Sequence, residues 1–263
     1  MQHTEVTQWC QYQRAGSLTP ATIKLRAYHV SRALKTIGKP PAAVTQEDLT
    51  AYLAAQPWSP ATRRAARQAL SLIFHWREQT GNGPSPARAL PAARVPRGVP
   101  HPAPDDAISG ALAMASPRVR LMIELMAYGG LRRGEVATVK PSDVRGQWLT
   151  VTGKGGHTRV VPLPPLLAER VARPRRAWLF PGAINGHLSA RRVGELVNEV
   201  LPAGYTAHSL RHRFATTVYS QTRDIRAVQS LLGHARLDTT MIYVAIANDQ
   251  ARAAAATAWK LTA

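Results

Sequence analysis

The sequence has 263 residues, of which 45% are hydrophobic. This is enough apolar material for folded cores and excludes a wholly disordered basic chain. Against 34 lysines and arginines stand only 15 acidic residues, so the formal net charge is +19. Such an excess repels itself unless a polyanion compensates it, and nucleic acid is the commonest one. A membrane surface is disfavoured because the basic residues are spread along the whole chain instead of along one amphipathic helix.

Three further features limit the class of protein. Cys10 is the only cysteine, which excludes an intrachain disulfide and a cysteine cluster for zinc. No apolar run approaches the roughly 18 residues that a membrane span needs. Residues 1–9 are polar and do not resemble a secretory signal. We therefore expect a cytoplasmic protein of one large domain or two modest ones, with no membrane partner.

The first third of the chain predicts helices over residues 23–37, 47–55 and 62–80. Thr19 and Ser59 each precede a proline, which is typical of a capped helix start, and Thr45 begins a capping-box-like pattern. Four apolar residues share one face of the third helix: Ala66, Leu70, Ile73 and Phe74. Its arginines are expected largely elsewhere: Arg63, Arg64, Arg67 and Arg77. These patterns predict a helical domain over residues 1–83.

Residues 84–104 contain recurring prolines with Arg88, Arg94 and Arg97 between them, and no helical or strand period. The composition predicts an extended basic linker between two domains. It is compatible with a solvated spacer or with a strap along a phosphate backbone. We favour the strap.

The remainder predicts a second domain, residues 105–263, of mixed structure. Strands are expected over 148–152 and 159–163, joined by a glycine-rich turn that carries Lys154. Helical spacing is present in six other ranges: 105–115, 118–127, 189–200, 208–220, 224–232 and 239–246. The alanine-rich range 250–259 would form one more helix, within a C-terminal tail over 244–263. The predicted fold class is mostly α with a small antiparallel β-sheet.

The second domain lacks the acidic clusters that metal-dependent nucleases need. Only Asp105 and Asp106 are adjacent, and helix capping explains them. We expect no metal and no other cofactor. A metal-independent route would use arginines, lysine and histidines around a phosphate, together with a side-chain nucleophile.

Four separated segments carry such residues. The first is Gly129-Gly130-Leu131-Arg132-Arg133-Gly134-Glu135. Its paired glycines end an apolar helix and expose the arginines at the start of another, where Glu135 would pair with Arg132 or cap the helix. The second is the turn with Lys154. In the third, His208, Arg211 and His212 fall on one helix face. Zinc is disfavoured there because Arg211 would place positive charge against the ion.

The fourth segment is Leu231-Leu232-Gly233-His234, followed by Tyr243. Taken singly, His234 would be a residue beyond a helix cap, Tyr243 a packing residue and Lys154 an exposed turn residue. The combination in one domain favours a common site. Six candidate catalytic residues result: Arg132, Lys154, His208, Arg211, His234 and Tyr243.

In these four motifs, in this order, the second domain resembles the tyrosine recombinase (phage integrase) family. The helical first domain is similar to the family's core-binding domain in architecture. The resemblance implies that Tyr243 attacks a phosphodiester and forms a 3′-phosphotyrosyl link, without metal or ATP. Arg132 and Arg211 would hold the non-bridging oxygens, and Lys154 would protonate the departing 5′-oxygen. His208 would assist proton transfer from Tyr243.

The family pattern further implies that His234 hydrogen-bonds the phosphate and that Glu135 is a supporting acid. Arg133 is the alternative to Arg132, because the motif is more basic than usual at this point. His157 and His212 match no catalytic position. Trp259 would anchor the tail either on its own domain or on a neighbouring protomer, and both alternatives stay open.

The resemblance also implies the partners. These are double-stranded DNA at core attachment-type sites and a homo-tetramer assembled on it, with host or phage accessory DNA-bending proteins, in the bacterial cytoplasm at the nucleoid. The expected function is site-specific recombination that integrates or excises phage or mobile-element DNA. The alternatives are a Xer-like dimer resolvase, a type IB topoisomerase-like activity, and a non-catalytic DNA-binding protein that retains the fold. A structural nucleoid or RNA-binding protein would explain the charge but not the six residues.

Overall fold

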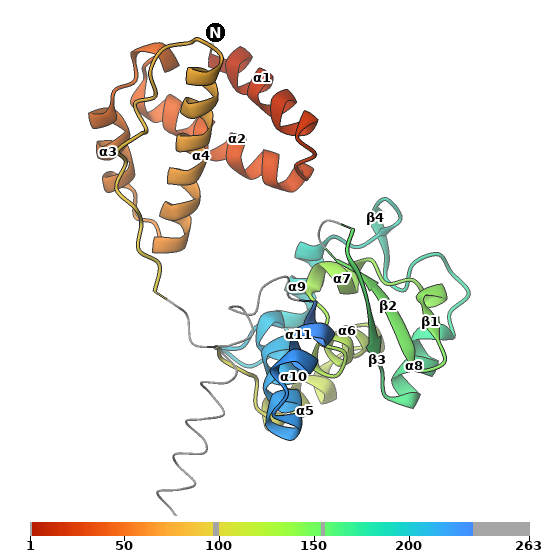
Figure 1. Ribbon diagram of the computed structural model, residues 1–263. Helices are drawn as coiled ribbons and strands as arrows, with labels where there is room; N and C mark the ends of the chain where they lie inside the picture. The colour runs from red at the N-terminus through yellow and green to blue at the C-terminus, as the bar shows by residue number, and fades with distance from the viewer. Residues whose placement is uncertain (1, 97–99, 154–155, 234–263) are drawn as a thin grey trace, which may run out of the picture. The chain divides into compact units, whose positions relative to one another are not determined.

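The computed structural model describes residues 2–96, 100–153 and 156–233, excluding the side chains of residues 2 and 3. The chain divides into two compact units, Met1–Gly98 and Val99–Ala263 (Figure 1). The boundary between them lies within the range predicted as a linker.

Unit 1 is helical throughout its described elements. These are α1 (Gln2–Ala15), α2 (Pro20–Ile37), the 3-10 turn η1 (Pro41–Ala43), α3 (Gln46–Ala55) and α4 (Pro60–Gln79). The capping residues expected from the sequence are in place, since Thr19 and Ser59 accept from the backbone N–H of Thr22 and Thr62. Thr45 and Asp48 form the complete capping box that begins α3.

Helix α1 was not expected from the sequence, which predicted only a polar terminus. Val6, Trp9 and Gln13 are nevertheless buried at helical spacing and attach α1 to the rest of unit 1. The predicted apolar face of α4 is buried, but the expectation for Arg77 is wrong. Arg77 is buried as well, because Glu5 of α1 forms an ion pair with it at 2.9 Å.

The range predicted as a linker contributes residues to both units. Ala87 and Leu90 are buried in the core of unit 1, and Arg67 of α4 donates two hydrogen bonds to the carbonyl oxygen of Leu90. At the other end, the N–H of Ala103 donates to the carbonyl oxygen of Ser209 in unit 2. Both ends of the range are therefore held by tertiary contacts.

Unit 2 combines helices with a small sheet (Figure 1). Its helical elements are α5 (Asp105–Met114), α6 (Pro117–Ala127), α7 (Arg133–Ala137), η2 (Pro141–Asp143), α8 (Pro165–Ala172), α9 (Ala190–Asn198), α10 (Ala207–Thr222) and α11 (Ile225–Leu232). Its strands are β1 (Val144–Arg145), β2 (Trp148–Thr152), β3 (Thr158–Pro162) and β4 (Pro181–Ile184). The prediction of a mostly helical protein with a small antiparallel sheet is confirmed.

The sheet has the order β1-β2-β3 and is antiparallel throughout. Leu149 pairs with Val161, and both are fully buried on the inner face. Their side chains join one core with α6, whose residues Met122, Ile123 and Leu125 are also fully buried. The predicted hairpin is thus held against the central helix of unit 2.

A separate small core joins α10 and α11. It consists of Phe214, Ala215, Tyr219, Val228 and Leu232. This packing fixes the C-terminal end of α11 beside α10. The motif that ends in Leu232 and Gly233 therefore lies next to the motif that contains Arg211. The helices predicted over 239–246 and 250–259 lie outside the described residues. The helix start expected after the paired glycines is present as α7, whereas helix α8 and strands β1 and β4 were not anticipated from the sequence.

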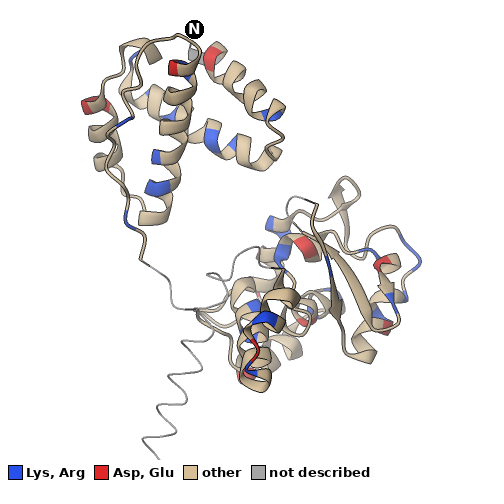
Figure 2. Ribbon diagram, in the orientation of Figure 1, with Lys and Arg blue, Asp and Glu red and all other residues tan. Residues whose placement is uncertain are grey.

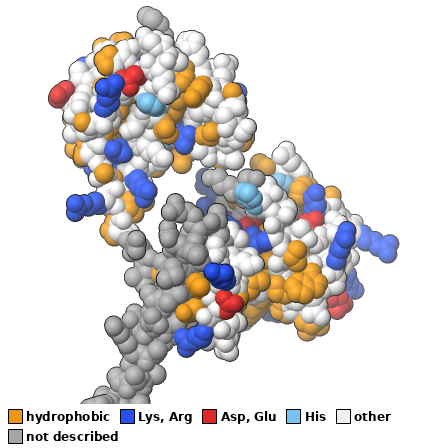
Figure 3. Space-filling view, viewed as in Figure 1, with side chains coloured by type: hydrophobic (Ala, Val, Ile, Leu, Met, Phe, Trp, Pro, Cys, Tyr) orange, Lys and Arg blue, Asp and Glu red, His pale blue; other side chains and the backbone are white. Residues whose placement is uncertain are grey.

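Basic residues occur on most elements of each unit (Figure 2). On the visible face, their side chains are spread out and only a few acidic ones accompany them (Figure 3). Among the described helices, none is long and apolar enough to cross a membrane.

Candidate active site

The site begins at a sharp turn between α6 and α7. Gly130 adopts φ of +65°, a left-handed conformation that suits glycine, and the ring of Phe214 occupies the space that a Cβ would need. The turn places Arg132 directly before α7, as the residue that caps this helix. The carbonyl oxygen of Gly130 points to the guanidinium of Arg211 and accepts a hydrogen bond from its Nη1.

Glu135 of α7 gathers three arginines around one buried carboxylate. It accepts hydrogen bonds from the backbone N–H and Nη1 of Arg132, both at 2.8 Å. It also accepts from Nη1 and Nη2 of Arg159 at 2.8 and 2.7 Å, and Arg211 lies at 3.7 Å. Burial raises the pKa of Glu135, but the hydrogen bonds from Arg159 and Arg132 outweigh this effect and lower the pKa to about 2. The carboxylate is therefore ionised and holds the arginines in place.

Arg211 of α10 connects the turn before α7 with the end of α11. Its side chain is only 2% exposed, and its Nη2 donates to the carbonyl oxygen of Leu232 at 2.7 Å. Gly233 ends α11 with φ of +61°, and its carbonyl oxygen accepts from Arg132 at 3.5 Å. Both arginines are thus held by backbone oxygens from α11 and by Glu135.

His208 lies in the first turn of α10, which Thr206 and Ser209 cap reciprocally. Its ring meets that of His212 one turn later, with centroids 4.2 Å apart. Burial lowers the pKa of His208, and the positive charges of Arg211, Arg132 and Arg133 lower it further. The neutral imidazole that results can accept a proton at neutral pH. For His212, burial and the neighbouring His208 and Arg211 lower the pKa to about 4.

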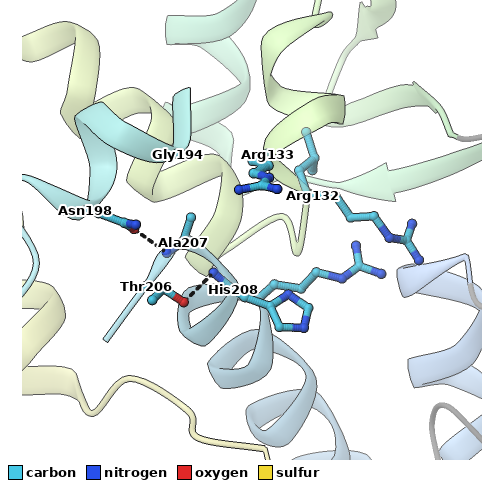
Figure 4. A pocket seen from close by; sticks show the side chains of 9 residues that line it. Arg132, Arg133, Gly194, Asn198, Thr206, Ala207 and His208 are labelled. Carbon is cyan, nitrogen blue, oxygen red and sulfur yellow. Dashed lines mark hydrogen bonds between the residues drawn. The ribbon is translucent and has the colours of Figure 1, made fainter. Parts of the chain in front are cut away.

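These side chains surround a cavity of about 430 Å³ (Figure 4). Its lining residues come from the start of α7, from α9 and from the start of α10: Leu131, Arg132, Arg133, Gly194, Asn198, Thr206, Ala207, His208 and Arg211. Among the described residues, four basic side chains and no carboxylate line the cavity. Asn198 and Thr206 are engaged in capping α10, since they accept from the N–H of Ala207 and of His208. The cavity is therefore suited to an anion. The described residues contain no group of three or more metal-ligating side chains.

Comparison with known proteins identifies the family. The phage integrase family matches residues 106–250, which is more than half of the chain. Tyrosine recombinase XerC of Methylobacterium nodulans is 33% identical over 245 residues, which cover 80% of this chain and 74% of that protein. Tyrosine recombinase XerA of Thermococcus kodakarensis is 32% identical over 258 residues, covering 90% and 88%. The chain belongs to the phage integrase family.

Solved structures agree with this assignment at the level of the fold. A lambda integrase dimer bound to a core site has a TM-score of 0.73 at 18% identity, covering 89% of this chain and 95% of that one. XerH recombinase in a post-cleavage complex with its difH substrate has a TM-score of 0.72 at 20% identity, covering 95% and 83%. Together with the family match and the relatives named tyrosine recombinase, this makes the protein a tyrosine-type site-specific recombinase, as the motifs predicted.

In this recombinase, the structure brings three of the six predicted residues to one cavity: Arg132, His208 and Arg211. The other three, Lys154, His234 and Tyr243, lie outside the described residues. Two of them have a described neighbour close to the site. Gly233, which precedes His234, accepts a hydrogen bond from Arg132. A Cβ at Gly153 would also lie 3.5 Å from Oε1 of Glu135.

Sequence reasoning on the recombinase missed Arg159. The residue was placed at the start of a strand, without a role. Alternation along β3 was the available signal, because Arg159 lies two positions before the buried Val161 and so faces the same side. An arginine on the inner face of a strand requires a buried anionic partner, and Glu135 is that partner. Arg133, considered only as an alternative to Arg132, lines the cavity together with it.

Proposed function

We propose that this recombinase binds duplex DNA and cuts and rejoins its strands through a 3′-phosphotyrosyl intermediate. The observation that carries the proposal is the cavity in which Arg132, His208 and Arg211 converge and to which the described part of the chain contributes no carboxylate. Forked guanidinium donors suit the non-bridging oxygens of a phosphodiester. Because backbone oxygens and Glu135 already hold both arginines, little reorganisation is needed when charge develops on the phosphorus centre.

The proposed roles divide between the described and the remaining residues. Arg132, whose side chain is 41% exposed, presents its free donors to the phosphate, while the buried Arg211 completes the positive charge. Tyr243 is the nucleophile and His208, neutral at pH 7, accepts its proton. Lys154 protonates the departing 5′-oxygen, and His234 hydrogen-bonds the phosphate. No step requires a metal ion or ATP.

The proposed domain roles follow from the same reaction. Residues 1–83 form the core-binding domain, with Ala87 and Leu90 of the linker packed into its core. The rest of the linker 84–104 lies along the DNA backbone, and residues 105–263 form the catalytic domain. The proposed substrate is duplex DNA with core-type sites, on which four copies assemble. The tail 244–263 docks either on its own catalytic domain or on a neighbouring protomer. Accessory DNA-bending proteins belong to the same proposal. Support comes from the lambda integrase tetramer bound to a Holliday junction, which has a TM-score of 0.72 to this chain.

The biological outcome is either integration and excision of mobile DNA or Xer-like resolution of replicon dimers. Curated relatives named XerC, XerD and XerA favour the Xer-like alternative. Sequencing of genomic DNA that becomes covalently attached to the protein in cells would distinguish the two. One chromosomal or plasmid site supports resolution, whereas attachment at the ends of a mobile element supports integration.

The chemistry is tested by relaxation of supercoiled plasmid in EDTA, with wild-type protein and Tyr243→Phe. We expect relaxation and covalent protein–DNA product from the wild type only. Equal relaxation by both proteins would exclude Tyr243 as the nucleophile. Salt-sensitive DNA binding without relaxation, and without covalent product on any genomic site, would support a non-catalytic DNA-binding protein instead.

A further inference from the structure

Arg133 differs from the other arginines around the site in having no protein acceptor among the described residues. Arg159 and Arg211 are buried and bonded to Glu135 or to backbone oxygens, and Arg132 is bonded to Glu135. Arg133 is exposed at the edge of the cavity, next to Arg132. An arginine that lines an anion-binding cavity without a counter-ion is available for a ligand.

Packing against α9 directs the Arg133 side chain into the cavity. Its Cδ would lie 3.4 Å from a Cβ built on Gly194, which is buried in the α7–α9 contact, so the absence of a side chain at Gly194 leaves space for the arginine stem. The close view shows the Arg133 guanidinium between Gly194 and Arg132, on the side of the cavity that faces the start of α10 (Figure 4).

The acidic residues of α9 do not neutralise Arg133. Glu195 pairs with Arg191 at 2.6 Å and with Arg192 at 3.5 Å, and Glu199 pairs with Arg192 at 3.3 Å. The charge of Arg133 reaches the cavity instead, since it contributes to lowering the pKa of His208. The cavity therefore carries one more positive charge than the pair Arg132 and Arg211 supplies.

The size of the cavity fits more than one phosphoryl group. At about 430 Å³ it falls in the range of pockets that hold a whole small molecule. Arg132 and Arg133 line this cavity from consecutive positions of the chain, so a strand that enters it can present one phosphate to each of them.

We propose that Arg133 binds the phosphate adjacent to the one held by Arg132 and Arg211, so that the cavity grips one nucleotide by both of its phosphates. The inference rests on the proposed function, because it takes the phosphate at Arg132 and Arg211 as the first of the two. It assigns Arg133 to substrate positioning and leaves Arg132 as the arginine of the reacting phosphate.

The test uses full-length Tyr243→Phe protein and two probes, thymidine 3′-monophosphate and thymidine 3′,5′-bisphosphate. Binding is followed by the ring NMR signals of His208, assigned through their loss in His208→Gln. We expect the bisphosphate to bind about tenfold more tightly than the monophosphate, as one charge-assisted pair permits. Arg133→Gln should abolish this preference and leave the monophosphate affinity unchanged. Arg133→Lys should retain part of the preference, because it keeps the charge.

Arg191→Gln is the matched control, because it removes the same charge from an arginine of α9 that is 88% exposed and pairs with Glu195 outside the cavity. It should leave both affinities unchanged. Three results would overturn the proposal. These are equal affinity of the unsubstituted protein for both probes, an equal loss for both probes in Arg133→Gln, and no loss in that variant. Since the titration does not involve strand cleavage, its outcome is separate from that of plasmid relaxation.

Discussion

Arg159 of β3 and Glu135 of α7 form a two-point ion pair, with Nη1–Oε1 and Nη2–Oε2 distances of 2.8 and 2.7 Å. Both side chains are nearly buried, at 9% and 4% exposure. The pair joins the sheet to the short helix that follows Arg132. The same carboxylate also binds Arg132, which is proposed to contact the phosphate. The orientation of Arg132 therefore depends on a residue of β3 that lies 24 positions after Glu135.

Replacement of Glu135 by glutamine is expected to destabilise the protein by about 3 kcal/mol, because it leaves buried guanidinium groups without a counter-charge. Urea unfolding at pH 7 measures the change. Glu195→Gln is the control, because Glu195 makes only exposed ion pairs and its replacement should cost far less stability. Equal effects of the two substitutions would contradict the role of Glu135.

Arg159→Lys keeps the charge but cannot make the two-point contact together with the hydrogen bond to the carbonyl oxygen of Leu231. We expect plasmid relaxation to slow by about tenfold, since a misplacement near 1 Å in a positioned group costs that much or more. DNA affinity should change little because Arg159 does not line the cavity. Arg170→Lys, at the more exposed pair with Glu124, should relax DNA at the wild-type rate. A loss of DNA affinity that matches the loss of rate would contradict this prediction.

Gly130→Ala is expected to cost about 2 kcal/mol or more. The backbone at φ of +65° disfavours a side chain, and the new methyl group would meet the ring of Phe214. Gly146→Ala separates the two effects, because Gly146 has φ of +59° but open space around it. Thermal unfolding of both variants should therefore show the larger loss for Gly130→Ala. Equal losses would mean that Phe214 moves aside without cost.

Protonation of His212 is expected to make stability depend on pH. Its pKa is about 4 in the folded protein, below the ordinary value of 6.5, so the unfolded chain takes up this proton first. The stability that neutral His212 contributes is complete above pH 6.5 and is lost as the pH falls towards 4. In a His212→Phe variant, the loss of unfolding free energy between pH 6.5 and 4 should be smaller by about 1 kcal/mol or more, as urea unfolding at several pH values would measure. A His212→Phe variant whose stability falls with pH as steeply as that of the wild type would contradict this prediction.

Local sequence patterns were sufficient for much of the fold. Helices α2, α3 and α4 begin where the capping residues indicated, because a cap is formed by residues three or four positions apart. The β2–β3 hairpin was also predictable, since alternating residues around a glycine-rich turn specify their own pairing. Helix α1 was missed because its few buried positions, Val6, Trp9 and Gln13, are surrounded by polar residues.

The sequence by itself determined which residue types stand at Arg132, His208 and Arg211, and their order identified the family. Only the tertiary structure decided how they are held. The carbonyl oxygens of Gly130 and Leu232 and the carboxylate of Glu135 come from separate elements, and folding brings them to the arginines. The same holds for the burial of Arg159 and of Arg77, each set by an acid on another element. Spacing along the chain cannot reveal such partners. These ion pairs and hydrogen bonds become strong only in the low-dielectric interior, which exists after the cores have packed.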